Sequence, residues 1–92
     1  MKIVLKNIKG AVGEYCDGVA RIDLSKDTHN PGSTAVHEIL HHLYPEMPEK
    51  MVLRKEKSIW KSLSEKQRIM VYKQLLSKRA NLIIRLVKEK IG

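Results

Sequence analysis

The chain has 92 residues, a net charge of +8 and one cysteine. This length allows one domain with a modest core, and the lone cysteine excludes an internal disulfide. Because no apolar run is long enough to span a bilayer and no signal-peptide pattern follows Met1, we expect a soluble, cytoplasmic protein without a membrane span.

The charge is divided unevenly along the chain. Residues 1–49 contain five Lys/Arg and seven Asp/Glu, whereas residues 50–92 contain thirteen and three. A basic region of this kind occurs in nucleic-acid-binding proteins, but it is also typical of solvated helix faces. Since no aromatic or arginine-rich stripe marks a base-reading surface, we favour solvated faces and do not expect nucleic acid as a partner.

The first part of the chain predicts a small β-sheet. Residues 2–6 have strand composition, and Asp17-Gly18 predicts a hairpin turn between strands at 13–16 and 19–24. Apolar and polar residues alternate in the second arm, which indicates a sheet with one buried face. Cys16 follows Tyr15 in a strand, so we expect it to fill the core rather than to cap a metal.

The next segment carries the HExxH pattern, His37-Glu38-Ile39-Leu40-His41. Capping residues and a proline precede it at 30–34, and Pro45 and Pro48 follow it, so a helix over about 31–43 is predicted. Four residues is a little over one turn, so both imidazoles project from one face and can share a metal ion. The apolar residues of this segment lie on the opposite face, which places the histidines at a cleft.

A catalytic zinc needs a third protein ligand and leaves its fourth position to water. The predicted helix over about 49–63 has an apolar stripe that includes Val52 and Trp60, and Glu56 lies within this stripe. An inward carboxylate is costly unless it is paired or bound to a metal, so Glu56 is our predicted third ligand. Glu49, two turns earlier on the same face, is the alternative, although at a helix start it can simply complement the helix dipole.

The remainder of the chain also predicts helix. Ser64 and Gln67 form a capping box, and an apolar stripe follows at helical spacing, with a break near Ser77–Asn81 left open. The members of this stripe are Ile69, Tyr72, Leu76, Ala80, Ile83, Val87 and Ile91. The whole pattern predicts a single α+β domain over residues 1–92, in which a small antiparallel sheet packs against the HExxH helix, a glutamate helix and a C-terminal helical segment.

These residues predict a zinc metallopeptidase with one zinc per chain, held by His37, His41 and Glu56. Zinc lowers the pKa of its bound water, and Glu38 is placed to act as the general base when that water attacks a peptide carbonyl. Tyr72, His42 and Tyr44 are candidate hydrogen-bond donors to the transition state. His42 points away from the ligand pair and is expected at the surface, and His29 is expected in a loop. An extended peptide substrate is expected along a sheet edge, either the 19–24 strand or the first strand.

With this motif, size and helix spacing, the chain resembles the minigluzincins, short soluble metallopeptidase zymogens that are similar to the catalytic domains of CAAX prenyl protease-type membrane enzymes. The resemblance covers nearly the whole chain and implies a minimal zincin fold. In those relatives an aspartate four residues after the glutamate ligand supports a ligating histidine. Trp60 stands at that position here, so this supporting role is vacant or is filled elsewhere.

The resemblance also implies latency, because C-terminal segments hold the family inactive within the chain or between partners. The apolar stripe of residues 65–92 must be buried against the protein's own core, its cleft or a second copy. We therefore expect low activity and a homodimer. The competing function is a non-catalytic, zinc-stabilised module that docks nucleic acid through the basic C-terminal helices, but closed structural sites normally use four protein ligands.

Overall fold

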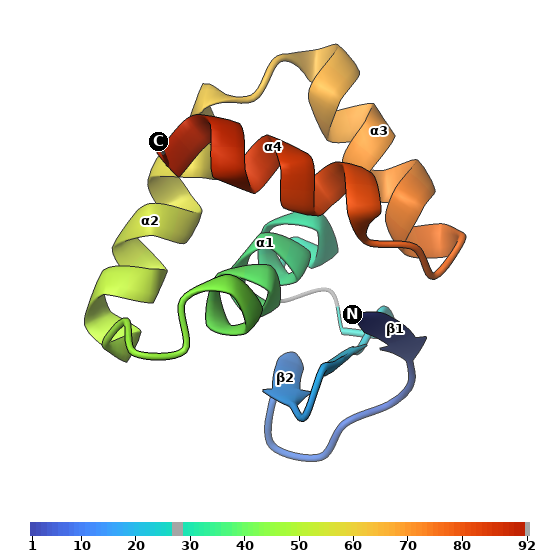
Figure 1. Cartoon of the computed structure of the whole chain (residues 1–92). Helices are drawn as coiled ribbons and strands as arrows, with labels where there is room; N and C mark the ends of the chain where they lie inside the picture. Colours follow the sequence, from blue (N-terminus) through green and yellow to red (C-terminus); the bar gives the residue numbers. More distant parts are fainter. Residues whose placement is uncertain (27–28, 92) are drawn as a thin grey trace.

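A computed structural model describes residues 1–26 and 29–91 of the chain (Figure 1). It is an α+β structure with a three-stranded sheet and four helices. The elements are β1 (Lys2–Leu5), β2 (Gly13–Cys16), β3 (Val19–Ile22), α1 (Pro31–Leu43), α2 (Glu49–Ser62), α3 (Glu65–Leu76) and α4 (Asn81–Ile91).

The sheet is mixed, so the prediction of an antiparallel sheet is wrong. β2 and β3 form the predicted antiparallel hairpin, and the φ angles of 48° at Asp17 and 77° at Gly18 are those of a turn with two left-handed residues. β1, however, runs parallel to β3 on its other side. The loop over residues 6–12 makes this possible, because it carries the chain from β1 across to the far edge of the sheet.

The strand order β1-β3-β2 contradicts one of the two predicted peptide-binding edges, the 19–24 strand, whereas the first strand is an edge as the alternative requires. β3 is paired on both sides, so it has no free edge for a substrate. β2 and β1 are the two edges, and of these β2 contacts α1.

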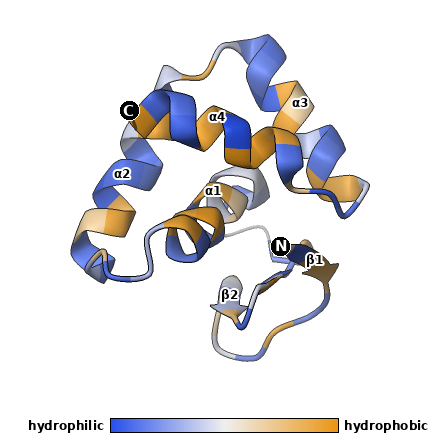
Figure 2. Cartoon of the chain, in the orientation of Figure 1, coloured by the Kyte–Doolittle hydropathy of each residue, from blue (hydrophilic) through white to orange (hydrophobic). Residues whose placement is uncertain are grey.

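The HExxH helix is confirmed over Pro31–Leu43. Asn30 caps it, accepting hydrogen bonds from the backbone N–H groups of Gly32 and Ser33 at 2.9 and 3.3 Å, and Pro31 occupies the first turn. Its buried apolar face lies in the centre of the molecule (Figure 2) and consists of Ala35, Val36, Ile39 and Leu40. Burial of this face holds the helix in place, and His37 and His41 on its other face line a cavity.

The C-terminal region forms two helices, α3 and α4. The helical segment is interrupted near Ser77–Asn81, where the sequence had left a break open. The predicted capping box at Ser64 is present. The predicted stripe is wrong in α3, where Ile69 and Leu76 are 47% and 65% exposed while Val71 and Leu75 are buried. The apolar residues of the two helices do not form one continuous stripe, because the chain turns at Ser77 and Lys78.

α4 packs on the protein's own core. Its buried residues are Ile83, Leu86 and Val87, and it contacts α1, α2 and α3. This is the first of the three burial sites considered for the C-terminal stripe. None of the helices in the described residues is long and apolar enough to cross a lipid bilayer.

Candidate metal centre

Both histidines of the HExxH pattern lie on one face of α1, as predicted. Their Nε2 atoms are 3.2 Å apart, and both side chains are partly buried. This spacing follows from the helix, because residues four apart lie one above the other. Two nitrogens bound to one tetrahedral zinc are separated by about 3.3 Å, so the pair is already close to a chelating geometry.

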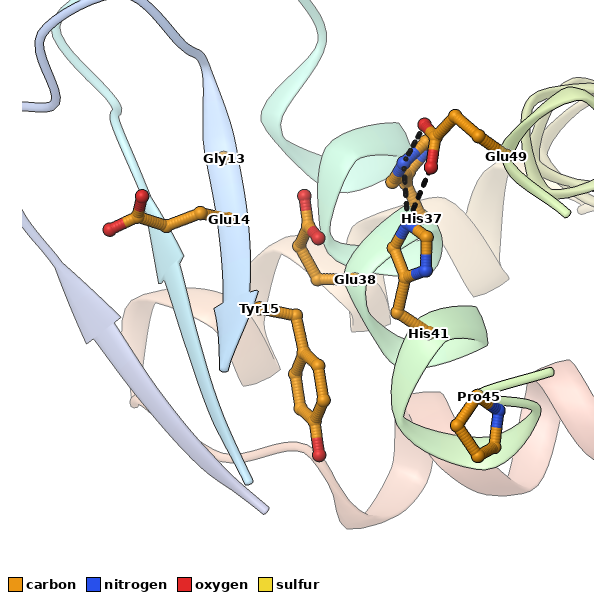
Figure 3. Close-up of a pocket in the computed structure, with 8 residues that line it drawn as sticks. All are labelled: Gly13, Glu14, Tyr15, His37, Glu38, His41, Pro45 and Glu49. Carbon is orange, nitrogen blue, oxygen red and sulfur yellow. Dashed lines mark hydrogen bonds and ion pairs between the residues drawn. The ribbon is translucent and has the colours of Figure 1, made fainter. Parts of the chain in front are cut away.

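The carboxylate that meets this pair is that of Glu49. Its Oε1 lies 2.9 Å from Nε2 of His37, and its Oε2 lies 2.8 Å from Nε2 of His41 (Figure 3). The chain turns between α1 and α2 at residues 44–48, which places the first residue of α2 over the exposed face of α1. Ligand atoms of His37, His41 and Glu49 all lie within 4.8 Å of one another.

Glu56, the predicted third ligand, contacts the other nitrogen of His37. Its Oε1 lies 2.7 Å from Nδ1, and its Oε2 accepts a hydrogen bond of 2.7 Å from the hydroxyl of Ser33. Although burial opposes it, the hydrogen bonds from His37 and Ser33 lower the pKa of Glu56. The structure therefore brings Glu49 to the Nε2 atoms of both histidines and places Glu56 at Nδ1 of His37.

This arrangement places a carboxylate at each nitrogen of the His37 ring. An ionised carboxylate only accepts hydrogen bonds, so Nδ1 carries a proton that is shared with Glu56, and Nε2, which faces Glu49, is the nitrogen at which a metal would replace a proton. Burial works against a proton on this ring, but the hydrogen bond to Glu56 and the nearby glutamates outweigh it and raise the pKa of His37. Two imidazole nitrogens and one carboxylate, with a further carboxylate behind the first imidazole, fit a zinc ion.

Glu38 lies beside the cluster without contacting the metal-facing nitrogens. Its side chain is 5% exposed and points toward β2 (Figure 3). Burial, with the charges of Glu49 and Glu56, raises the pKa of Glu38 to about 7. A carboxylate with a pKa near neutrality can both accept and return a proton under physiological conditions.

β2 reaches Glu38 closely because residue 13 is glycine. A Cβ at this position would lie 2.8 Å from Oε2 of Glu38 and 2.6 Å from Cγ2 of Thr34. No local signal in the sequence marks Gly13, because the contact joins a strand to a helix. Ser33 was also missed, although its place one turn before His37 puts it on the same helix face.

Two adjoining cavities share His37, Glu38, Gly13 and Glu49 in their walls. One has a volume of about 400 Å³ and includes Tyr15, His41 and Glu49 in its wall. The other has a volume of about 630 Å³, and its wall includes Leu53 and Lys57 of α2 together with residues from the N-terminal part of α1. Among the described residues, those lining the two cavities come from the first two thirds of the chain and none from α3 or α4.

The other candidates from the sequence have structural partners. The Tyr72 hydroxyl donates to Oδ1 of Asn30 at 2.8 Å and so supports the cap of α1, and Tyr72 itself lines neither cavity. His42 Nδ1 lies 2.7 Å from the Tyr15 hydroxyl, which joins α1 to β2.

His29, expected in a loop, does precede α1, where it bridges the Thr34 hydroxyl and the Asp23 carbonyl, each at 2.7 Å. Cys16 is exposed, so its predicted role as core filler is wrong. Tyr44, a further candidate donor, is partly buried beside the core.

Comparison with known proteins adds no relative: no family model, curated protein or solved structure matches the chain significantly. The class defined by the structure is therefore a small α+β domain with a His/His/Glu cluster on its HExxH helix.

Proposed function

We propose that this protein is a zinc-dependent peptidase whose metal is held by His37, His41 and Glu49. The observation that carries the proposal is the pairing of the Glu49 carboxylate with Nε2 of both motif histidines, while the buried Glu38 stays out of the ligand set. The ligand assignment thus moves from Glu56 to Glu49, which was the alternative expected from the sequence.

Glu56 then has the role of an orienting residue. In metal sites a histidine commonly donates its second N–H to a carboxylate, which fixes the ring and increases its basicity. Glu56 accepts such a bond from Nδ1 of His37, and Ser33 in turn holds Glu56. With Glu49 as the ligand, the position four residues further on is Leu53, which cannot support a histidine, and in this proposal Glu56 and Ser33 take the supporting role instead.

In the proposed reaction, zinc and Glu38 have different roles. Zinc supplies Lewis acidity, which polarises a carbonyl and acidifies water. Glu38 accepts the proton of the attacking water and passes it to the leaving amine. Its burial against Gly13 and Thr34 keeps bulk water from competing for that proton and holds the carboxylate beside the ligand pair.

The outer edge of β2 is the proposed binding site for the peptide. Asp23 N–H donates to the Val12 carbonyl at 3.0 Å, and the register pairs Glu14 with Arg21, so the backbone groups of residues 12 and 14 face β3. Those of Gly13 and Tyr15 consequently face outward, beside Glu38. An extended peptide can pair with them and place a carbonyl at the cluster without a specific sequence.

The test combines metal analysis with one conservative variant. The wild-type protein should bind close to one zinc per chain and hydrolyse a quenched fluorescent peptide library, and chelation should abolish the activity. Glu38→Gln should retain zinc while peptide hydrolysis falls by about 10²–10⁴-fold. Loss of zinc from this variant, or full activity without Glu38, would contradict the proposal.

The alternative of a non-catalytic module held together by zinc needs a closed site. Such sites normally take four protein ligands, and three converge here among the described residues. The proposal also does not require latency, since α4 is packed on the core and the described lining of the cavities excludes it. A homodimer remains a prediction of the resemblance.

A further inference from the structure

Four basic residues form a stripe along the outer face of α2. Lys50, Arg54, Lys57 and Lys61 are separated by four, three and four residues, and all are exposed. This spacing keeps them on one side of a helix, away from the buried Val52 and Ile59. The stripe extends over about 16 Å at 1.5 Å per residue. We call these four residues the α2 stripe.

Among the described residues, no member of the α2 stripe forms a salt bridge, although the charge of Lys57 contributes to the lowered pKa of the neighbouring Glu56. The two glutamates of α2 are turned toward the histidines of α1 instead. Within the part of the chain that the structure describes, the outer side of α2 thus presents four exposed cations.

The α2 stripe reaches the wall of the proposed catalytic cleft through its third member, Lys57. Lys57 lines the cavity of about 630 Å³ together with Leu53, His37 and Glu38. α1 contacts β2 as well as α2, so a peptide paired with the outer edge of β2 would have α2 as its opposite wall (Figure 1). The ribbon of α2 is coloured mainly as hydrophilic above its first turns (Figure 2).

We propose that the α2 stripe selects substrates that carry acidic residues a few positions from the bond to be cleaved. This inference rests on the proposed function and names the substrate class of the same cleft. Charge complementarity supplies affinity and orientation, and the continuity of the stripe with the cavity at Lys57 makes the peptide substrate itself the occupant. Nucleic acid is less well matched, because the one aromatic residue of α2, Trp60, packs against Tyr72 and does not offer a stacking surface.

The experiment measures binding, so it does not depend on turnover. The protein is the zinc-loaded Glu38→Gln form, and the probes are fluorescein-labelled extended peptides that differ only in carrying four glutamates or four glutamines on one side of a central apolar pair. A single-stranded oligothymidylate of equal charge is the third probe. Fluorescence anisotropy at low and physiological salt gives the dissociation constants.

Two further variants, each made in this background, remove the same amount of charge from different surfaces. The stripe variant combines Lys50→Gln, Arg54→Gln, Lys57→Gln and Lys61→Gln. The control variant combines exposed residues of α3 and α4, namely Lys66→Gln, Lys73→Gln, Arg85→Gln and Lys88→Gln. Circular dichroism establishes that both remain folded.

The acidic peptide should bind about tenfold more tightly than the glutamine peptide, and this preference should disappear in the stripe variant but persist in the control variant. Equal loss in both variants would overturn the proposal, since net charge alone would then explain binding. Tighter binding of the oligonucleotide than of the acidic peptide, lost in the stripe variant, would also overturn it and assign the stripe to nucleic acid. Zinc-dependent hydrolysis by the wild-type protein without any preference for acidic peptides would refute substrate selection by the α2 stripe but leave the proposed function standing. A preference for acidic peptides without zinc-dependent hydrolysis would refute the proposed function alone.

Discussion

Two regions in the described part of this small protein each contain a buried carboxylate, and the pKa values of these two carboxylates are shifted in opposite directions. In the loop behind the sheet, Asp23 is 1% exposed and accepts hydrogen bonds from the backbone of Ile8 and from the backbone and hydroxyl of Ser25. The Ser25 hydroxyl and the Ile8 N–H in particular lower the pKa of Asp23 to about 2. This carboxylate fastens the loop over residues 6–12 to the end of β3.

In the cleft, burial has the reverse effect. Glu38 is 5% exposed, and burial raises its pKa to about 7 rather than lowering it, because no comparable set of donors stabilises its charge. Burial of a carboxylate therefore does not by itself mark a functional site. The informative property is whether the surrounding donors favour the ionised form.

Both regions are supported by a core to which α4 belongs. Deletion of the chain after Ser77 removes Ile83, Leu86 and Val87, all buried. The truncated protein should be unfolded, since losing several buried aliphatic side chains exceeds the marginal stability of a domain of this size. Far-UV circular dichroism and urea titration test this. A folded truncated protein with raised peptidase activity would instead identify the C-terminal segment as the inhibitory element implied by the resemblance.

Within the cleft, the two glutamates of α2 should differ in their effect on zinc affinity. Glu49→Ala removes a proposed ligand and should weaken zinc binding by more than about 100-fold, whereas Glu56→Gln removes an orienting carboxylate and should weaken it by about 10–100-fold. Competition titration with a chromophoric chelator measures both. Glu46→Ala, in the exposed turn before α2, is the matched acidic control and should have no effect. The reverse order of Glu49 and Glu56 would restore Glu56 as the ligand.

The raised pKa of Glu38 predicts that the metal-free protein is stabilised by its removal. A folded pKa of about 7 lies above the ordinary value of 4.5, so the ionised form is penalised in the folded state. Glu38→Gln should therefore increase the free energy of unfolding, with a gain that develops as the pH rises from 4.5 to about 7 and is then constant. At pH 8 the gain should be about 3 kcal/mol. Urea unfolding of chelator-treated protein at pH 5 and pH 8 measures it, and an equal gain at both values would contradict the assignment.

The opposite pH dependence is expected for Asp23, with the smallest effect of the series. Its folded pKa of about 2 lies below the ordinary 3.8, so its ionised form contributes stability above pH 3.8 that is lost as the pH falls toward 2. Asp23→Asn should destabilise the protein at neutral pH, and the difference from wild type should shrink between pH 4 and pH 2. Thermal unfolding over this range tests it. A difference that stays constant with pH would indicate that the amide loses packing rather than charge.

The sequence by itself determined the local features of this protein. The helix over residues 31–43, the Asp17-Gly18 turn and the Ser64 capping box were all predicted, because each depends on residues within a few positions of one another. The placement of His37 and His41 on one face follows from helix periodicity alone. The coarse α+β class follows from the same signals.

Only the tertiary structure decided the relations between elements. The parallel pairing of β1 with β3, and hence the choice of β2 as the edge beside the site, depends on how the loop over residues 6–12 crosses the sheet. The proposed change of metal ligand from Glu56 to Glu49 has a similar reason. Glu56 is inward-facing, as its place in an apolar stripe predicts, but the angle at which α2 crosses α1 directs it to Nδ1 of His37. The same angle brings the more exposed Glu49 to both Nε2 atoms. A helix pattern specifies which face is buried, whereas the atom that each side chain reaches depends on the packing of the two helices.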